Sequence, residues 1–485
     1  MASRRNQLHS YQFMVQRVVA ALVMRETDPA QSPFRRAAGA IFAGIMIGAI
    51  VLAGFAVYGL WDPGGNMRWK ADSDANNGQP VVVIEEETGA RYVYMQGVLY
   101  PVENYASALL VGTVDGRTKE PYYVSRDSLA DAEGIQLGPR IGIPGAPDSL
   151  PSQENLIRGD WSLCTQPRET SSGETELETV LVVGAQPSPK EVMANEGVLL
   201  VQEAESSAKY LIYHSHKFRI SQEAAVLEAL SIRDRTPLQV GAAWLNGLPE
   251  GQEIKPLEVP DKGEPSELRE DLTIGTLIYV ETEAGGNYYV AMRDKLAAIT
   301  EFQAAILRAA EDVEPVSMTL GEASAKETTD QLLPSRQQLE APPETATLAM
   351  ADPNPQQATC AVFGANGDRP PTIVYNGDLS AYEGGVLTVE QGDEGVELAG
   401  RVVVAPGKGT VVWTSQNPED RTGGLLVLIT DTGYYYPLES VEILERLGYD
   451  LKATNPGWVP TSLVERLPRG PTLSPEAAMK PVPMQ

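Results

Sequence analysis

One uninterrupted run of 25 uncharged residues, from 37 to 61, constrains this chain more than any other feature. It reads AAGAIFAGIMIGAIVLAGFAVYGLW and lies between Arg36 and Asp62. At about 1.5 Å per residue, a helix of this length crosses the roughly 30 Å hydrocarbon core of a bilayer. Buried helices of soluble proteins rarely continue this far without a charge, and the apolar part of a cleavable signal peptide is shorter, about 7–15 residues. The run therefore predicts an uncleaved, single-pass transmembrane helix.

The charges on either side of this run predict its orientation in the cell (inner) membrane. Residues 1–36 hold six arginines against two acidic residues, a net charge of +4. The whole chain carries −27, so the residues after 36 carry −31. Because basic flanks stay in the cytoplasm, we expect a cytoplasmic N-terminus and a large extracytoplasmic C-terminal domain. A chain this acidic also lacks the cationic face that nucleic acid requires, so no nucleic-acid partner is expected.

A second helix is predicted within the cytoplasmic residues 1–36. Over residues 7–25 apolar side chains recur at helical spacing, and Asp28-Pro29 ends the pattern. These positions form one apolar stripe: Leu8, Tyr11, Val15, Val18 and Leu22. The stripe suits either the lipid surface or docking on the cytoplasmic parts of other subunits, and the pattern fits both.

Small residues recur at every fourth position inside the membrane run. They are Ala40, Gly44 and Gly48, the last two forming a GxxxG motif. Side chains this small allow a second helix to approach closely, so we expect them to face a partner helix in the membrane.

The residues after the anchor contain four copies of one pattern. Three copies, at 91–110, 209–230 and 288–309, superpose without gaps, and a fourth fits at 425–448. In three copies a tyrosine, and in the fourth Leu428, precedes a branched apolar residue by ten positions; the pairs are Tyr92 and Val102, Tyr210 and Ile220, Tyr289 and Ile299, and Leu428 and Leu438. A further strand is predicted upstream in each copy, at 81–84, 198–201, 276–280 and 410–414. The apolar period changes from two to about 3.6 at the same place in every copy, which predicts a strand meander followed by one helix.

The start of each predicted helix carries a polar residue that could cap it. Thr300 and Gln303 form a capping box, while Ser221 and Ser440 occupy the corresponding places in two other copies.

The gaps between the copies predict how the domains are arranged. The gaps after the first and third copies are long, and each contains one cysteine and short strand-like runs. We expect an α+β ectodomain in which four hairpin–helix repeats surround a central β domain assembled from both gaps, with repeats 1 and 4 on one side and repeats 2 and 3 on the other. The predicted boundaries are 1–36 for the cytoplasmic segment, 37–61 for the membrane helix, 62–80 for a stalk, 81–130 for repeat 1, 131–197 for the first part of the central domain, 198–250 for repeat 2, 251–310 for repeat 3, 311–358 for an acidic, proline-rich linker, 359–409 for the second part of the central domain, 410–450 for repeat 4 and 451–485 for an extended C-terminal tail.

The chain has two cysteines, Cys164 and Cys360, one in each long gap. In an oxidising exterior such a pair favours one disulfide, which would close a long loop and stabilise the fold by up to about 5 kcal/mol. The alternative is two free, buried thiols.

Few residue patterns in the chain indicate a catalytic, nucleotide-binding or metal site. Ala405–Thr410 reads APGKGT and resembles a phosphate-binding loop, which makes Lys408 a weak nucleotide candidate. However, Gly409 stands where a Walker A motif needs Ser or Thr, and a strand rather than a helix is expected to follow. His214 and His216 lie in a predicted hairpin turn and lack a visible third metal ligand. We expect no catalytic residues, no metal and no cofactor; paired acids are too common in this chain to support or exclude a glycosidase.

The sequence resembles the EccB family, a single-pass membrane component of type VII (ESX) secretion systems. The resemblance is carried by YPVENYASALL at 100–110, GPRIGIPGAPDSLP at 138–151, WSLCTQ at 161–166 and LGYDLKATNPGWVPTSLVERLPRGPTLSPEAA at 447–478. Leu109 and Thr165 depart from the family pattern, where a basic residue and an aspartate are expected. The resemblance also implies four repeats around a disulfide-closed central domain.

This resemblance implies partners and leaves three functions to compare. The implied partners are an EccC-like motor ATPase, EccD, EccE and the mycosin protease, with further copies of the chain in the same complex. The first hypothesis is a structural subunit of the translocon. The alternatives are a membrane-anchored ATPase, because family members carry that label, or a module that binds cell-wall peptidoglycan.

Overall fold

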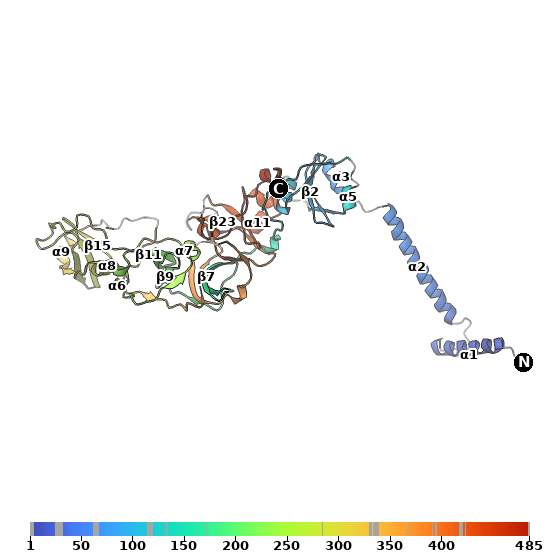
Figure 1. The fold of residues 1–485 in the computed structure, drawn as a ribbon, viewed down its shortest axis with the longest axis horizontal. Coiled ribbons are helices and arrows are strands. Elements are labelled where there is room, and N and C mark those ends of the chain that lie inside the picture. Colours follow the sequence, from blue (N-terminus) through green and yellow to red (C-terminus); the bar gives the residue numbers. More distant parts are fainter. Residues whose placement is uncertain are drawn as a thin grey trace.

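The structure is a computed structural model that describes residues 4–24, 33–61, 67–113, 120–130, 132, 134–170, 172–283, 285–328, 332, 339–367, 369–389, 391–392, 395–416, 421 and 423–483. Two N-terminal helices are followed by an elongated ectodomain of helices and sheets (Figure 1). This mixed architecture confirms the predicted α+β class.

The predicted membrane helix is present. Helix α1 (Arg4–Met24) precedes the long helix α2 (Pro33–Trp61). Within α2, Ala38–Tyr58 are long and apolar enough to cross a bilayer, and none of this segment is buried in the rest of the chain. Among the described residues it is the one helix with these properties. An apolar helix left uncovered in this way requires lipid or other helices around it.

Each repeat is a meander of three antiparallel strands followed by a helix, as predicted. The strands and helices of these first halves are β1 (Val81–Glu85), β2 (Arg91–Met95), β3 (Val98–Pro101) and α4 (Tyr105–Gly112) in repeat 1; β9 (Gly197–Glu203), β10 (Lys209–Tyr213), β11 (His216–Arg219) and α6 (Glu223–Ala229) in repeat 2; β13 (Leu277–Thr282), β14 (Gly285–Ala291), β15 (Leu296–Ile299) and α8 (Glu301–Glu311) in repeat 3; and β23 (Gly409–Ser415), β24 (Leu426–Thr430), β25 (Tyr435–Pro437) and α10 (Glu442–Arg446) in repeat 4.

Each repeat also has a second half that the sequence pattern did not reveal. After the helix, a short strand returns to pair in parallel with the first strand of the meander. A short helix follows, and the chain then pairs in parallel with the third strand. The elements of these second halves are β4 (Tyr122–Val124), α5 (Arg126–Ala130) and β5 (Gln136–Leu137); β12 (Leu238–Val240) and α7 (Ala242–Gly247); β16 (Val316–Ser317), α9 (Leu320–Ser324) and β17 (Glu327–Thr328); and α11 (Leu451–Thr454), β26 (Gly457–Pro460) and α12 (Thr461–Val464).

Three predicted boundaries are corrected by these second halves, the first of them at residue 130, because β5 of repeat 1 lies beyond it. Residues 316–328 complete the sheet of repeat 3, so they are not part of a linker. Further along the expected linker, β18 (Ala349–Met350) pairs with β9 of repeat 2. Residues 451–473 complete repeat 4, so the expected C-terminal tail is mostly a folded part of the ectodomain.

The expected stalk at 62–80 also contains folded structure. Helix α3 (Arg68–Ala75) packs on the sheet of repeat 1. Trp69 is fully buried there, its ring centroid 5.1 Å from that of Tyr94 in an edge-on arrangement. One buried tryptophan supplies enough apolar area to hold a short helix that has no apolar periodicity of its own.

The central domain is one seven-stranded sheet, and it is built from both long gaps as predicted. The strand order is β21-β22-β7-β6-β19-β20-β8. The first gap supplies three strands and the second supplies four; they are β6 (Trp161–Glu169), β7 (Thr175–Val183) and β8 (Glu191–Val192), and β19 (Ala358–Phe363), β20 (Thr372–Gly377), β21 (Val386–Leu387) and β22 (Arg401–Val403).

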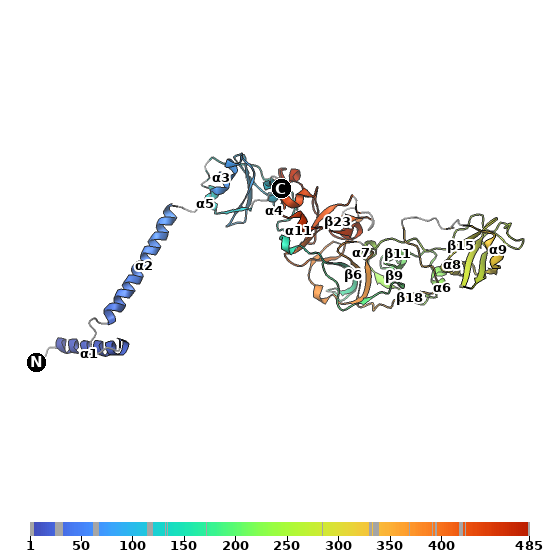
Figure 2. The same cartoon turned by 180° about the vertical axis from the view of Figure 1, so that it is seen from behind.

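Repeats 2 and 4 pack on the same face of this sheet, where Trp244 of α7 and Val427 of β24 lie in one cluster with Leu163 of β6. This corrects the expectation that repeats 1 and 4 lie on the opposite side from repeats 2 and 3. Repeats 1 and 4 share one hydrophobic core, in which Leu110 of α4 packs in the same cluster as Leu444 of α10. Helix α13 (Pro475–Ala478) packs against α4, so the C-terminus lies beside repeat 1 (Figure 2). Repeats 2 and 3 meet through α6 and α8 at the far end from α2 (Figure 1).

The helix caps agree with the sequence in one case and differ in two. Thr300 and Gln303 form the predicted capping box of α8. Ser221 does not cap α6, which starts after Gln222 in the left-handed conformation, and Ser440 does not cap α10, which starts after Val441. The tight strand-to-helix turns shift the first helical residue past both serines.

Candidate functional site: exposed anchor helices and a disulfide-closed central domain

The apolar stripe of α1 is exposed along its whole length. All five predicted residues, Leu8, Tyr11, Val15, Val18 and Leu22, are open to their surroundings. Ala20 lies away from the stripe and is buried, and α1 contacts α2. The stripe therefore remains free while another side of α1 approaches the anchor.

The exposed apolar surface of α1 is wider than the sequence stripe. Met14 borders the stripe and is exposed, and Phe13 is exposed on another side with the Arg17 guanidinium 5.9 Å from its ring centre. Periodicity identified only the residues on one line of the helix, so these two were missed. An apolar surface of this size has a cost in water and calls for a partner or a lipid surface.

The small residues of α2 are exposed as well. Ala40, Gly44 and Gly48 lie on the surface of α2, and a side chain added at either glycine would meet no other atom of the described chain within 4 Å. Their place opposite a partner helix stays a prediction.

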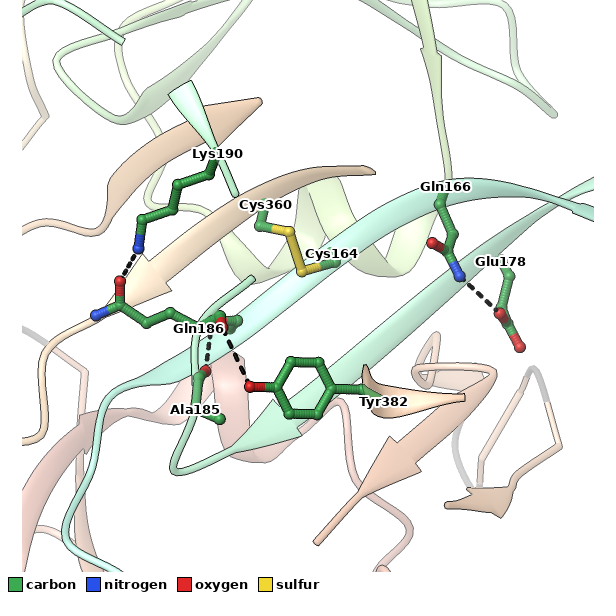
Figure 3. Close-up of a disulfide and its surroundings, with 9 residues drawn as sticks. Cys164, Gln166, Glu178, Ala185, Gln186, Lys190, Cys360 and Tyr382 are labelled. Atoms are coloured by element: carbon green, nitrogen blue, oxygen red, sulfur yellow. Dashed lines mark hydrogen bonds between the residues drawn. A yellow bond between two sulfur atoms is a disulfide. The ribbon is translucent and has the colours of Figure 1, made fainter. Parts of the chain in front are cut away.

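Cys164 and Cys360 form the predicted disulfide (Figure 3). The two residues stand directly opposite each other on the neighbouring antiparallel strands β6 and β19. Both are fully buried, in a cluster with Val180 and Leu379. The bond therefore joins the two gap segments at the middle of the central sheet, and covalently closes the domain that they build.

The loop that resembles a phosphate-binding loop is a tight turn between β22 and β23. The Lys408 backbone N–H donates to the Ala405 carbonyl at 3.0 Å. The neighbouring Gly407 N–H donates to the Asp431 carboxylate at 2.7 Å, so this backbone donor is already bonded within the chain. Strand β23 follows directly, without a helix N-terminus to attract an anion. This geometry disfavours nucleotide binding at Lys408.

The two histidines of the β10–β11 turn point to different partners. His214 Nδ1 lies 3.2 Å from Glu340 and its Nε2 lies 3.6 Å from Glu196, whereas His216 Nδ1 contacts the His214 carbonyl at 2.7 Å. Burial, together with a hydrogen bond donated to Glu196, raises the pKa of the adjacent Tyr213 to about 12. Across the residues that the structure describes, no group of three or more histidine, cysteine or acidic side chains could hold a metal ion.

The chain matches known proteins over its whole length. The family model described as "Type VII secretion system ESX-1, transport TM domain B" matches residues 1–482. A relative from Mycolicibacterium smegmatis, named ESX-3 secretion system ATPase EccB3, is 25% identical over 97% of this chain and 89% of its own length. A relative from Mycobacterium tuberculosis, named ESX-1 secretion system ATPase EccB1, is 24% identical over 98% of this chain and 93% of its own length.

Solved structures show the same fold. A chain in the structure of an intact ESX-5 inner membrane complex aligns with a TM-score of 0.60 at 22% identity, covering 100% of this chain and 97% of that one. A chain in the structure of the EccB3 dimer from the ESX-3 core complex aligns with a TM-score of 0.59 at 22% identity, covering 82% of this chain and 100% of that one. With the family model spanning the anchor, all four repeats and the disulfide-closed central domain, the resemblance noted in the sequence is confirmed, and the chain belongs to the EccB family of type VII (ESX) secretion systems.

Proposed function

We propose that this chain is a structural subunit of an ESX translocon, crossing the inner membrane once and assembling with motor and channel subunits to export proteins. The observation that carries the proposal is the family match over residues 1–482, which includes the membrane helix and the complete ectodomain. The exposed apolar stripe of α1 supports it, because an apolar surface of this kind needs a partner or a lipid surface to cover it.

The orientation and the partners follow from charge and family. The basic N-terminal segment supports a cytoplasmic α1 and an extracytoplasmic ectodomain. We expect an EccC-like motor ATPase and EccD at the membrane and cytoplasmic side, with EccE and a mycosin protease as further partners. A solved relative is described as a dimer, which supports several copies of this chain in one complex.

The test is the size and composition of the complex in secreting cells. After mild detergent extraction, native gels should show the chain in a complex of several hundred kilodaltons or more, and a gentle pull-down should recover EccC-like and EccD-like proteins. A chain that migrates as a free monomer in extracts of intact, actively secreting cells would contradict the proposal.

Exposed α1 is the most direct point at which to disrupt assembly. Changing Val15→Asp together with Val18→Asp should leave the chain in the membrane, because α2 alone satisfies the bilayer. The same change should uncouple the chain from the complex, since two unpaired carboxylates buried at an interface would cost several kcal/mol. The measurement is the yield of EccC-like and EccD-like partners that co-purify with the chain.

A matched control separates the stripe from general charge effects. Gln12→Asp with Gln16→Asp adds the same two charges on α1 outside the stripe, and should preserve the complex. Partners recovered at wild-type levels with the Val15 and Val18 variant would contradict protein docking by α1 and favour lipid contact instead.

A second candidate function, ATP hydrolysis, is suggested by the names of the relatives. The backbone near Lys408 is already bonded within the chain. We therefore expect the purified Lys408→Ala variant to have the same stability as the unaltered chain and to show no difference from it in an ATP hydrolysis assay. Turnover is measured with the full chain in detergent, with peptidoglycan cleavage assayed in parallel. Turnover that disappears in Lys408→Ala would establish the ATPase alternative; sedimentation with isolated walls without cleavage would support a peptidoglycan-binding module.

A further inference from the structure

A cleft of about 430 Å³ lies over the central sheet, between the β6–β7 hairpin and strand β21. Its lining includes Gln166 and Arg168 from β6, Glu178 from β7 and Arg401 from β22. Figure 3 shows Gln166 farther along β6 from Cys164, with Glu178 beside it on the neighbouring strand β7. The cleft is separate from α1, α2 and the Lys408 turn.

One buried carboxylate in the cleft faces two guanidinium groups. The Glu178 side chain is 6% exposed, and Arg401, 11% exposed, donates to it from Nη2 at 2.7 Å. Arg168 donates to the other Glu178 oxygen from Nη1 at 3.1 Å, and Gln166 Nε2 lies 3.4 Å away as a further donor. Both oxygens of Glu178 are therefore already bonded.

The groups of the cleft that remain available to bind a ligand are hydrogen-bond donors, those of the two guanidinium groups. Arg401 Nη1 donates to the Tyr382 and Glu383 carbonyls, but Arg401 Nε is buried and has no hydrogen-bond partner among the residues that the structure describes. Arg168 is half exposed at the rim, and its Nη1 is directed to Glu178. The Glu383 side chain is exposed, and it is the backbone oxygen of Glu383 that binds Arg401. An acceptor, and above all a carboxylate, complements these guanidinium groups.

The rim next to the arginines is apolar. Leu387 and Val389 on and beside β21 are 63% and 67% exposed. Strand β21 is an edge strand of the central sheet, and the Thr388 N–H donates to Gly400 at 3.0 Å. Since the hydrogen-bonding groups of successive strand residues point in opposite directions, the backbone groups of Leu387 and Val389 point to the open edge. An extended peptide could bond to them and place its side chains over the cleft.

We propose that this cleft and the adjacent β21 edge bind an extended peptide segment of a partner protein, one that presents a carboxylate beside aliphatic side chains. The carboxylate complements the arginine pair, and the aliphatic side chains cover Leu387 and Val389. A lipid headgroup does not fit the position, because repeat 1 lies between α2 and the central domain (Figure 1). The proposal does not depend on which complex the chain joins.

The test compares two labelled peptides on the full chain in detergent. The probes are acetyl-Val-Leu-Glu-Leu-Val-amide and the same peptide with Gln in place of Glu, followed by fluorescence anisotropy. The Glu peptide should bind on the order of tenfold more tightly, because charge-assisted bonds to arginine exceed neutral ones. Arg168→Gln should remove this preference. The matched control Arg269→Gln, which breaks an exposed ion pair with Asp271 in repeat 3, should leave it unchanged.

Further measurements test the apolar rim and the nature of the ligand. Leu387→Gln with Val389→Gln should weaken both peptides, and hydrogen exchange at 386–389 should slow when the Glu peptide binds to the unaltered chain. Equal affinity for the two peptides, or a Glu preference that survives Arg168→Gln, would overturn the proposal. Displacement of the peptide by equal concentrations of acetate or sulfate would reduce the cleft to a simple anion site, and a rim variant that changes only self-association would assign the rim to a second copy of the chain.

Discussion

Replacing Cys164 and Cys360 together by alanine is expected to lower the stability of the central domain by about 3–5 kcal/mol. The disulfide links residues 196 apart, so its loss frees a long loop in the unfolded chain. The two segments that it joins supply all seven strands of the central sheet, and without the bond only packing and hydrogen bonds hold them together. The measurement is the denaturant midpoint, together with hydrogen exchange of the β6 and β19 amides.

The control for this prediction is Val180→Ala. Val180 lies on β7 opposite Cys164 of β6 and is fully buried in the same cluster. Its truncation therefore removes local packing but leaves the disulfide intact. Its expected loss is smaller, about 1–3 kcal/mol. If the double cysteine variant loses no more stability than Val180→Ala, the disulfide contributes little beyond packing and the stabilising role of loop closure is wrong.

The repeats could be predicted because their strands and helices are long enough to show a period. In each copy the change from alternation to helical spacing marks the end of the meander, and the unequal gaps indicated a separate central domain. The second half of each repeat could not be found in this way. Its strands are only two to four residues long, as in β5 and β26, and they form by parallel pairing with strands that are distant in the sequence.

Helix α3 could not be predicted from apolar periodicity either. Its residues have no apolar stripe, and the surrounding DPGG and NNGQP segments suggested a stalk. A single buried contact of Trp69 with Tyr94 holds it on repeat 1. Tertiary contacts of one large side chain are invisible to a periodicity argument.

Of the candidate sites, the α1 stripe could be predicted from the sequence and the central cleft could not. The α1 stripe lies on one helix and its spacing is a local property, so the sequence predicted its residues. The central cleft depends on the parallel pairing of β22 with β7, which brings Arg401 to Glu178 across 223 positions. The sequence analysis did not identify Gln166 or Arg168, because nothing in the local pattern indicates which side chains their face of the strand meets.

The repeats of the elongated ectodomain are held together by contacts of different size. Repeats 1 and 4 come from opposite ends of the ectodomain sequence and share a core, and α13 adds to that contact. Repeat 2 packs against the central sheet, with Trp244 in the same cluster as Leu163 and Leu181, whereas repeat 3 lies farther out and contacts repeat 2 through α6 and α8 (Figure 1). The packing of α8 on α6 is therefore the contact that holds repeat 3 on repeat 2.

Phe302→Ala is therefore expected to loosen repeat 3 from repeat 2. Phe302 of α8 is 1% exposed and packs, with Ile306, into a cluster otherwise formed largely by repeat 2, including Val226 and Leu230. Truncating a buried phenylalanine typically costs about 3–5 kcal/mol, and here the loss falls mainly on the contact between repeats. Hydrogen exchange should rise in both α6 and α8, and small-angle scattering should show a broader distribution of end-to-end distances.

A substitution inside repeat 3 distinguishes this loosening from general unfolding. Leu296 of β15 is fully buried in the separate core of repeat 3, so Leu296→Ala should raise exchange in β13–β15 and leave α6 protected. Phe302→Ala should give the opposite pattern, with α6 affected and the β13–β15 meander protected, because the sheet keeps its own core. Unchanged exchange in α6 after Phe302→Ala would mean that repeat 3 is held by other contacts, and the packing of α8 on α6 would then not be what fixes the far end of the ectodomain.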